Sequence, residues 1–148
     1  MEEVIKPECE VRIIADTDSE IRAIGKTRMV EGYAIVFNSE SRDLGGFKEV
    51  ILPSAIDGLI ERSDVLALMN HDVARGLLAR STNGKGSLEL IPDQKGVIYR
   101  FTAPDTTLGN ELIEGLKRGD IRTSSFAFCS ISPVVLILKK LAPCRMNR

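Results

Sequence analysis

The segment MVEGYAIVF, residues 29–37, is rich in β-branched and aromatic residues, which is typical of a β-strand. Further strands are predicted on both sides of it, separated by turn residues such as Asn83-Gly84 and residues 93–96. They cover residues 11–14, 48–52, 65–69, 76–80, 87–90, 97–102 and 121–128. This pattern favours a mainly β (α+β) fold, and we expect a closed or partly closed antiparallel β-barrel flanked by a few helices.

Two helices are predicted among these strands. Ser54 is suited to cap a short helix over residues 55–61. Asp105 is suited to cap a longer helix over residues 106–118, and Gly119 to take the left-handed position after it. The apolar stripe of the longer helix consists of Leu108, Leu112, Ile113 and Leu116.

The composition excludes several classes of protein. The 148 residues fit one domain, 43% of them are hydrophobic, and the net charge of −1 gives no nucleic-acid footprint and no basic membrane surface. The three cysteines lack the spacing of a zinc site, and their odd number argues against a disulfide framework. No secretory signal, membrane span or cofactor motif is evident, so we expect a soluble intracellular protein without a metal or cofactor.

The composition also changes along the chain. Residues 1–10 are expected to be a loose lead-in, residues 11–128 the main domain, and residues 129–148 an atypical C-terminal tail. No aspartate or glutamate follows Asp120, whereas five lysines and arginines do. A solvated basic terminus and a truncated or frameshifted end both account for this tail.

His71 is the only histidine, and it follows the apolar strand predicted over residues 65–69. A single histidine is more often structural than catalytic. Its position favours catalysis, because the chain must emerge toward solvent at Asn70-His71-Asp72. A serine hydrolase needs a base that is neutral near pH 7, which histidine provides without a large pKa shift.

Ser124 and Ser125 lie in the last predicted strand. Side chains alternate across a strand, so Ser124 should share an inward face with Phe126, and Ser125 should share the opposite, smaller face with Thr123. Paired serines in a strand are usually inert, but if one is a nucleophile, the geometry favours Ser125. Cys129 is better explained as a small buried residue.

Five segments of the chain resemble the prohead (capsid-maturation) proteases of tailed phages, which are related to the herpesvirus capsid protease assemblin. They occur in family order and are GYAIVFNSESRDLGGFKEVILPSAI, DVLALMNHD, LLARSTNGKGSLEL, PDQKGVIYRFTAPDTTLGNELIEGLKRGDI and SSFAF. Together they span about residues 28–128. The resemblance implies an assemblin-like barrel and a serine endopeptidase.

The resemblance also implies roles for single residues. His71 matches the histidine of the family's NHD segment, the general base, and Ser125 matches the nucleophile of its Ser-Phe-Gly-Phe-like strand. The implied partners are the major capsid protein and scaffold segments, cleaved inside the assembling prohead in the host bacterial cytoplasm. By analogy with assemblin, the resemblance also allows a homodimer.

The sequence departs from the family after the serine strand. The family draws a third catalytic group, typically acidic, from that region, and here no acidic residue follows Asp120. Two hypotheses therefore stand side by side. The chain is an active endopeptidase, or it is an inactive prophage remnant or assembly factor that binds capsid or scaffold protein without cutting it.

Overall fold

The computed structural model describes residues 9–13, 22–23, 27–41, 43, 45–70, 72–129 and 135–140. Within them, strands form two sheets. The larger has the order β1-β9-β10-β4-β5-β6, made of β1 (Cys9–Ile13), β9 (Ile121–Cys129), β10 (Val135–Lys140), β4 (Asp64–Met69), β5 (Ala79–Thr82) and β6 (Lys85–Gly86). The smaller has the order β2-β3-β8-β7, made of β2 (Arg22–Ala23), β3 (Met29–Val36), β8 (Gly96–Thr102) and β7 (Glu89–Pro92).

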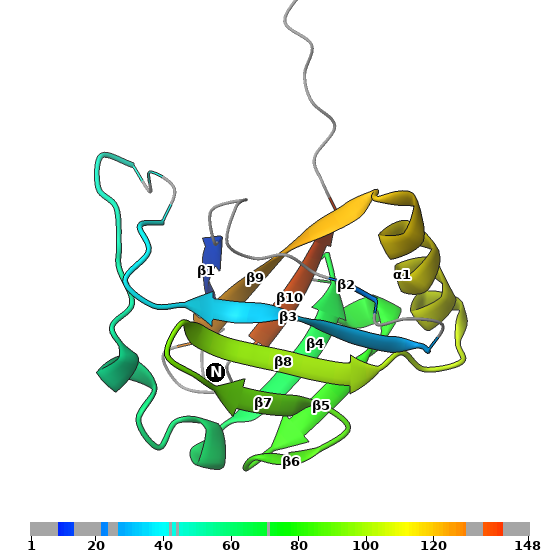
Figure 1. The fold of residues 1–148 in the computed structure, drawn as a ribbon, viewed down its shortest axis with the longest axis horizontal. Helices are drawn as coiled ribbons and strands as arrows, with labels where there is room; N and C mark the ends of the chain where they lie inside the picture. Colours follow the sequence, from blue (N-terminus) through cyan, green and yellow to red (C-terminus); the bar gives the residue numbers. More distant parts are fainter. Residues whose placement is uncertain are drawn as a thin grey trace, which may run out of the picture.

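The two sheets pack on one another with their strands crossing, as Figure 1 shows. Their buried side chains form one core, with Val30, Tyr99 and Phe101 from the smaller sheet and Ala67 and Phe126 from the larger. The prediction of a mainly β protein with few helices is confirmed. The strand pairings describe two sheets rather than a closed ring, so barrel closure stays a prediction.

Strand β10 occupies a central position in the larger sheet. It runs antiparallel to β9 on one side and parallel to β4 on the other, and β10–β4 is the one parallel pair among the described strands. It lies in the segment for which the sequence predicts an atypical tail. The boundary predicted at residue 128 stays a prediction.

Two turns agree with their sequence signatures. Asn83 and Gly84 both have positive φ angles, 51° and 79°, and join β5 to β6 in a tight hairpin. Asp93 accepts hydrogen bonds from the backbone of Lys95 and Gly96, both at 2.8 Å, at the turn between β7 and β8. The predicted strand over residues 76–80 begins later, at Ala79, and extends to Thr82 as β5. A 3₁₀ helix, η3 (Val73–Arg75), precedes it and ends at Gly76, which has a φ of 99°.

The long helix is confirmed as α1 (Thr107–Arg118), followed by Gly119 at φ 78°. Its cap differs from the prediction, because Thr106 rather than Asp105 accepts the hydrogen bond from the Gly109 amide, at 3.1 Å. Leu112 is fully buried, which stabilises the docked helix by about 2 kcal/mol. Leu108 and Ile113 are also buried, whereas Leu116 is partly buried.

The short helix over residues 55–61 was a wrong prediction. Two 3₁₀ turns, η1 (Pro53–Ile56) and η2 (Ile60–Arg62), replace it, and Ser54 lies inside η1 instead of capping it. Gly58 lies between them with φ 65°, a left-handed conformation that an α-helix cannot contain.

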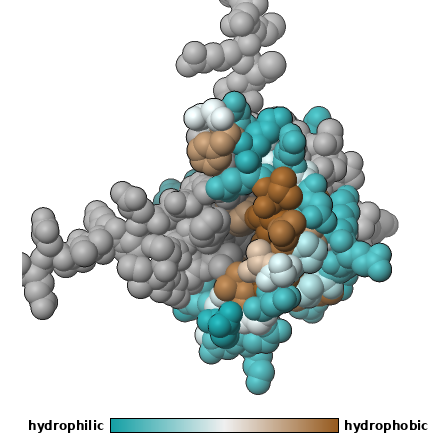
Figure 2. All heavy atoms as spheres, turned by 90° about the vertical axis from the view of Figure 1, so that its left-hand side faces the viewer, coloured by the Kyte–Doolittle hydropathy of each residue, from teal (hydrophilic) through white to brown (hydrophobic). Residues whose placement is uncertain are grey.

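The strand predicted over residues 48–52 is also absent. Val50 makes a single bridge to Glu40 and continues no ladder. Phe47, Val50 and Leu52 are about half exposed. Figure 2 views the side of the molecule to which this segment belongs, and it shows a strip of hydrophobic surface with hydrophilic residues along one side of it.

No helix among the described residues is long and apolar enough to cross a membrane.

Candidate active site

The chain turns sharply where β4 ends. Asn70 has a φ of 53°, a left-handed conformation that asparagine tolerates better than most residues. Beyond position 71, the Asp72 amide donates to the Met69 carbonyl at 3.1 Å, and the Asp72 carboxylate accepts from the Ala74 amide at 3.0 Å. Asp72 therefore caps η3. His71 itself lies outside the described residues.

The two serines of β9 occupy successive positions in the larger sheet. Ser124 is fully buried, and its hydroxyl donates to the Tyr33 carbonyl at 2.7 Å, which ties β9 to β3 of the other sheet. Phe126 is also buried, so the prediction that these two side chains face the core is confirmed. Thr123 is only 6% exposed, so the face that it shares with position 125 is covered at that point.

The structure describes Ser125 by its backbone position. It pairs with Ile13 of β1 and with Ile137 of β10, so it lies in the interior of the sheet. The exposure and direction of its side chain fall outside the described part, and its predicted role stays a prediction.

Strand β10 relates the two candidate positions to each other. Leu138 pairs with Ser124 on one side and with Met69 on the other. The strand that leads into position 71 (β4) and the strand that carries Ser125 (β9) are therefore separated by one strand, β10. Two inter-strand spacings amount to roughly 10 Å.

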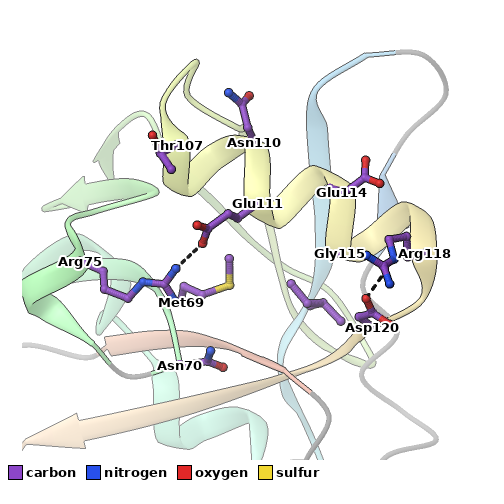
Figure 3. Close-up of a pocket in the computed structure, with 11 residues that line it drawn as sticks. Met69, Asn70, Arg75, Thr107, Asn110, Glu111, Glu114, Gly115, Arg118 and Asp120 are labelled. Atoms are coloured by element: carbon purple, nitrogen blue, oxygen red, sulfur yellow. Dashed lines mark hydrogen bonds and ion pairs between the residues drawn. The ribbon is translucent and has the colours of Figure 1, made fainter.

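A groove of about 540 Å³ lies beside Asn70, between α1, the end of β4 and the start of β9. Figure 3 shows its residues, and two ion pairs mark its ends. Arg75 of η3 pairs with Glu111 of α1, and Arg118 pairs with Asp120 at 3.3 Å. The lining residues are Met69, Asn70, Arg75, Thr107, Asn110, Glu111, Glu114, Gly115, Arg118, Asp120 and Ile121.

The sequence analysis missed this groove. The sequence feature that indicates the groove is a polar stripe along α1, next to the apolar stripe that faces the core. This polar stripe runs from Thr107 through Glu111 and Glu114 to Arg118. The ion partner of Glu111 could not be found in the same way, because Arg75 is 36 residues away in the chain.

Tyr99 lies close to Ser124 in the core. Its hydroxyl is buried and makes no well-formed hydrogen bond. Burial raises the pKa of Tyr99 well above its ordinary value, and the nearby Ser124 hydroxyl opposes this rise. The phenol is therefore neutral at physiological pH, and its ring belongs to the core.

Among the described side chains, no three histidine, cysteine, aspartate or glutamate residues converge in a way that could hold a metal ion.

The two packed sheets place the serine-bearing strand β9 two strands from β4, which ends two residues before position 71. Comparison with known families makes the class of the protein specific. The chain belongs to the caudovirus prohead serine proteases, whose family model matches residues 16–134. No curated protein and no solved structure matches it. Membership supports a role in phage capsid maturation, and it confirms the resemblance drawn from the five sequence segments.

Proposed function

We propose that this chain is a serine endopeptidase that cleaves scaffold and capsid-protein segments inside the assembling prohead. The observation that carries the proposal is its membership of the prohead serine protease family over residues 16–134. The sheet order supports it, because β4, which leads into position 71, and β9, which carries Ser125, are separated only by β10.

In this proposal Ser125 is the nucleophile and His71 the general base. The Ser125 hydroxyl attacks the scissile carbonyl while His71 takes its proton, and His71 then returns the proton to the leaving amine. Water hydrolyses the acyl-enzyme in a second step. Backbone amides must stabilise the oxyanion, a contribution of roughly 3–4 kcal/mol per donor.

The architecture favours Ser125 over Ser124 for this role. The Ser124 hydroxyl is fully buried and already donates to a main-chain carbonyl. A nucleophile must be free to attack, and strand alternation assigns position 125 to the face of β9 opposite the core-facing Ser124.

A fluorophosphonate probe tests this assignment, because it labels activated serines without needing the natural substrate. We expect the folded chain to be labelled, with labelling abolished in Ser125→Ala and strongly reduced in His71→Ala. Ser124→Ala is the matched control, and we expect its folded fraction to keep the label. Labelling that survives in Ser125→Ala would exclude Ser125 as the nucleophile.

A non-cleaving assembly factor is the second candidate, and one observation favours it. No aspartate or glutamate follows Asp120, so neither β9 nor β10 offers a carboxylate to orient His71. Loss of the orienting carboxylate lowers kcat by about 10⁴ in a well-studied triad. A folded chain that no probe labels, but that still binds capsid or scaffold protein, would support this candidate instead.

A further inference from the structure

We infer that the groove along α1 is a subsite for the substrate polypeptide and that it selects a basic side chain through Glu114. The inference rests on the proposed protease function, since it names the kind of segment that this site would take. It is argued from the position, the dimensions and the charges of the groove.

The position of the groove fits a substrate subsite. Asn70, one of its lining residues, immediately precedes the proposed base at position 71. Ile121, another lining residue, begins the strand that carries Ser125 four residues later. A chain lying in the groove would therefore run toward the proposed catalytic residues.

The dimensions suit an extended peptide. The lining residues on α1 run from Thr107 to Arg118, eleven residues apart, which corresponds to roughly 16 Å of helix. An extended chain advances about 3.3 Å per residue, so the groove can hold about five residues. The helix approaches β9 closely at Gly115, where an added Cβ would come within 2.6 Å of Ile121 Cδ1. The Ile121 side chain therefore packs directly against the backbone of α1 at this point.

The charges of the groove favour a cation. Its lining contains three carboxylates and two guanidinium groups. Both guanidinium groups are already engaged, Arg75 by Glu111 and Arg118 by Asp120. Glu114 forms no ion pair or hydrogen bond within the described part of the chain, so it is the carboxylate left to meet a ligand.

A polar neighbour adds to Glu114. Asn110 precedes it by four residues on α1, so both side chains lie on the same side of the helix. Figure 3 shows them on the side of α1 that points away from Met69 and Asn70, so they line the outer edge of the groove. The Asn110 amide can donate to and accept from a peptide backbone. Glu114 would then give the preference for a basic side chain, whereas Asn110 would bind the peptide backbone whatever the substrate sequence.

Peptide binding to the Ser125→Ala variant tests this inference without requiring catalysis. Three fluorescent octapeptides that differ only in a central lysine, glutamine or glutamate are titrated at low salt, and their anisotropy is measured. We expect the lysine peptide to bind tightest and the glutamate peptide weakest. When Glu114→Gln is introduced into the Ser125→Ala variant, the preference for the lysine over the glutamine peptide should fall about three-fold, the scale of an exposed ion pair. Glu114→Lys in the same variant should reverse the preference.

Glu61→Gln is the matched control, because Glu61 is an exposed glutamate on η2 that does not line the groove. It should leave the preference unchanged, and raising the salt should weaken the preference of the unmodified groove. Equal binding of the three peptides, no binding of any, or a preference that survives Glu114→Gln would overturn the inference. Probe labelling is a separate result, so failure of the protease proposal and failure of this subsite can be told apart.

Discussion

Replacing Gly109 by alanine is expected to destabilise the protein, although alanine is the better helix former. Gly109 lies in the first turn of α1, where helix propensity alone predicts a gain of about 1 kcal/mol. The structure opposes this gain, because an added Cβ would lie 1.9 Å from the Pro104 carbonyl oxygen and 3.0 Å from its carbon. Both are backbone atoms, so the helix start or the preceding segment must move.

The magnitude follows from three contributions. Overpacking of this kind costs about 1–3 kcal/mol. Movement of the first turn also weakens the hydrogen bond from the Gly109 amide to Thr106 Oγ1, and loss of such a cap costs about 1 kcal/mol. Set against the gain in propensity, the expected destabilisation is about 2 kcal/mol, which for a chain of this size lowers Tm by about 4–8 °C.

Urea unfolding followed by circular dichroism measures this loss, and thermal unfolding checks it. Gly115→Ala is the matched control, because its Cβ would meet the tip of the Ile121 side chain at 2.6 Å rather than backbone. That tip can rotate, so we expect a smaller loss there. A Gly109→Ala protein as stable as the unsubstituted chain, or more stable, would refute the close packing of α1 on Pro104.

Three further perturbations have defined outcomes. Ser124→Ala should lower the free energy of unfolding in urea by about 1–2 kcal/mol, because it removes the hydrogen bond from the buried Ser124 hydroxyl to the Tyr33 carbonyl. Ser87→Ala is the control, because its hydrogen bond with the Arg80 amide is exposed, and it should change the free energy by less than about 0.5 kcal/mol. Equal effects of the two substitutions would contradict the placement of Ser124 in the core. The pKa of Asp93 is lowered by the Tyr33 hydroxyl and by the Gly96 and Lys95 amides. The stabilisation from these contacts is present above the unfolded pKa of about 4 and is lost as the pH falls through the lower folded pKa. Urea unfolding between about pH 5 and pH 2 should therefore show that stability falls less steeply in Asp93→Asn than in the unsubstituted chain. Truncation after residue 134 removes β10 and exposes the edges of β4 and β9; gel filtration should show aggregation or unfolding, and a folded monomer would contradict the central placement of β10.

The strands and the long helix were predictable because their signals are local. Alternation, β-branched residues and the Asn83-Gly84 turn identified most of the strands, and the apolar stripe identified α1. The cap of α1 was misassigned by one residue because Asp105 and Thr106 are both good capping residues, and the choice depends on which oxygen the Gly109 amide reaches. The predicted strand over residues 48–52 failed because no neighbouring strand continues the single Val50 bridge.

What depends on distant contacts could not be predicted. The role of β10 requires pairing with β4, and Val135 and its partner Leu66 are 69 residues apart. The groove depends on an ion pair between η3 and α1, two elements that are far apart in the chain. At the candidate site, the sequence singled out the His71 position and Ser125 by local context, and it correctly assigned Ser124 to the core.

The place of β10 has a consequence for the synthesis of the protein. It is the last described strand to leave the ribosome, yet the strands on both of its sides need it as a partner. Some 70 residues separate the end of β4 from the end of β10, and at ordinary translation rates they take about 4–14 s to make. During that interval the edge of β4 that pairs with β10 stays open in the nascent chain. The larger sheet therefore cannot be completed before β10 has been made, and a chaperone that shields this edge should raise the yield.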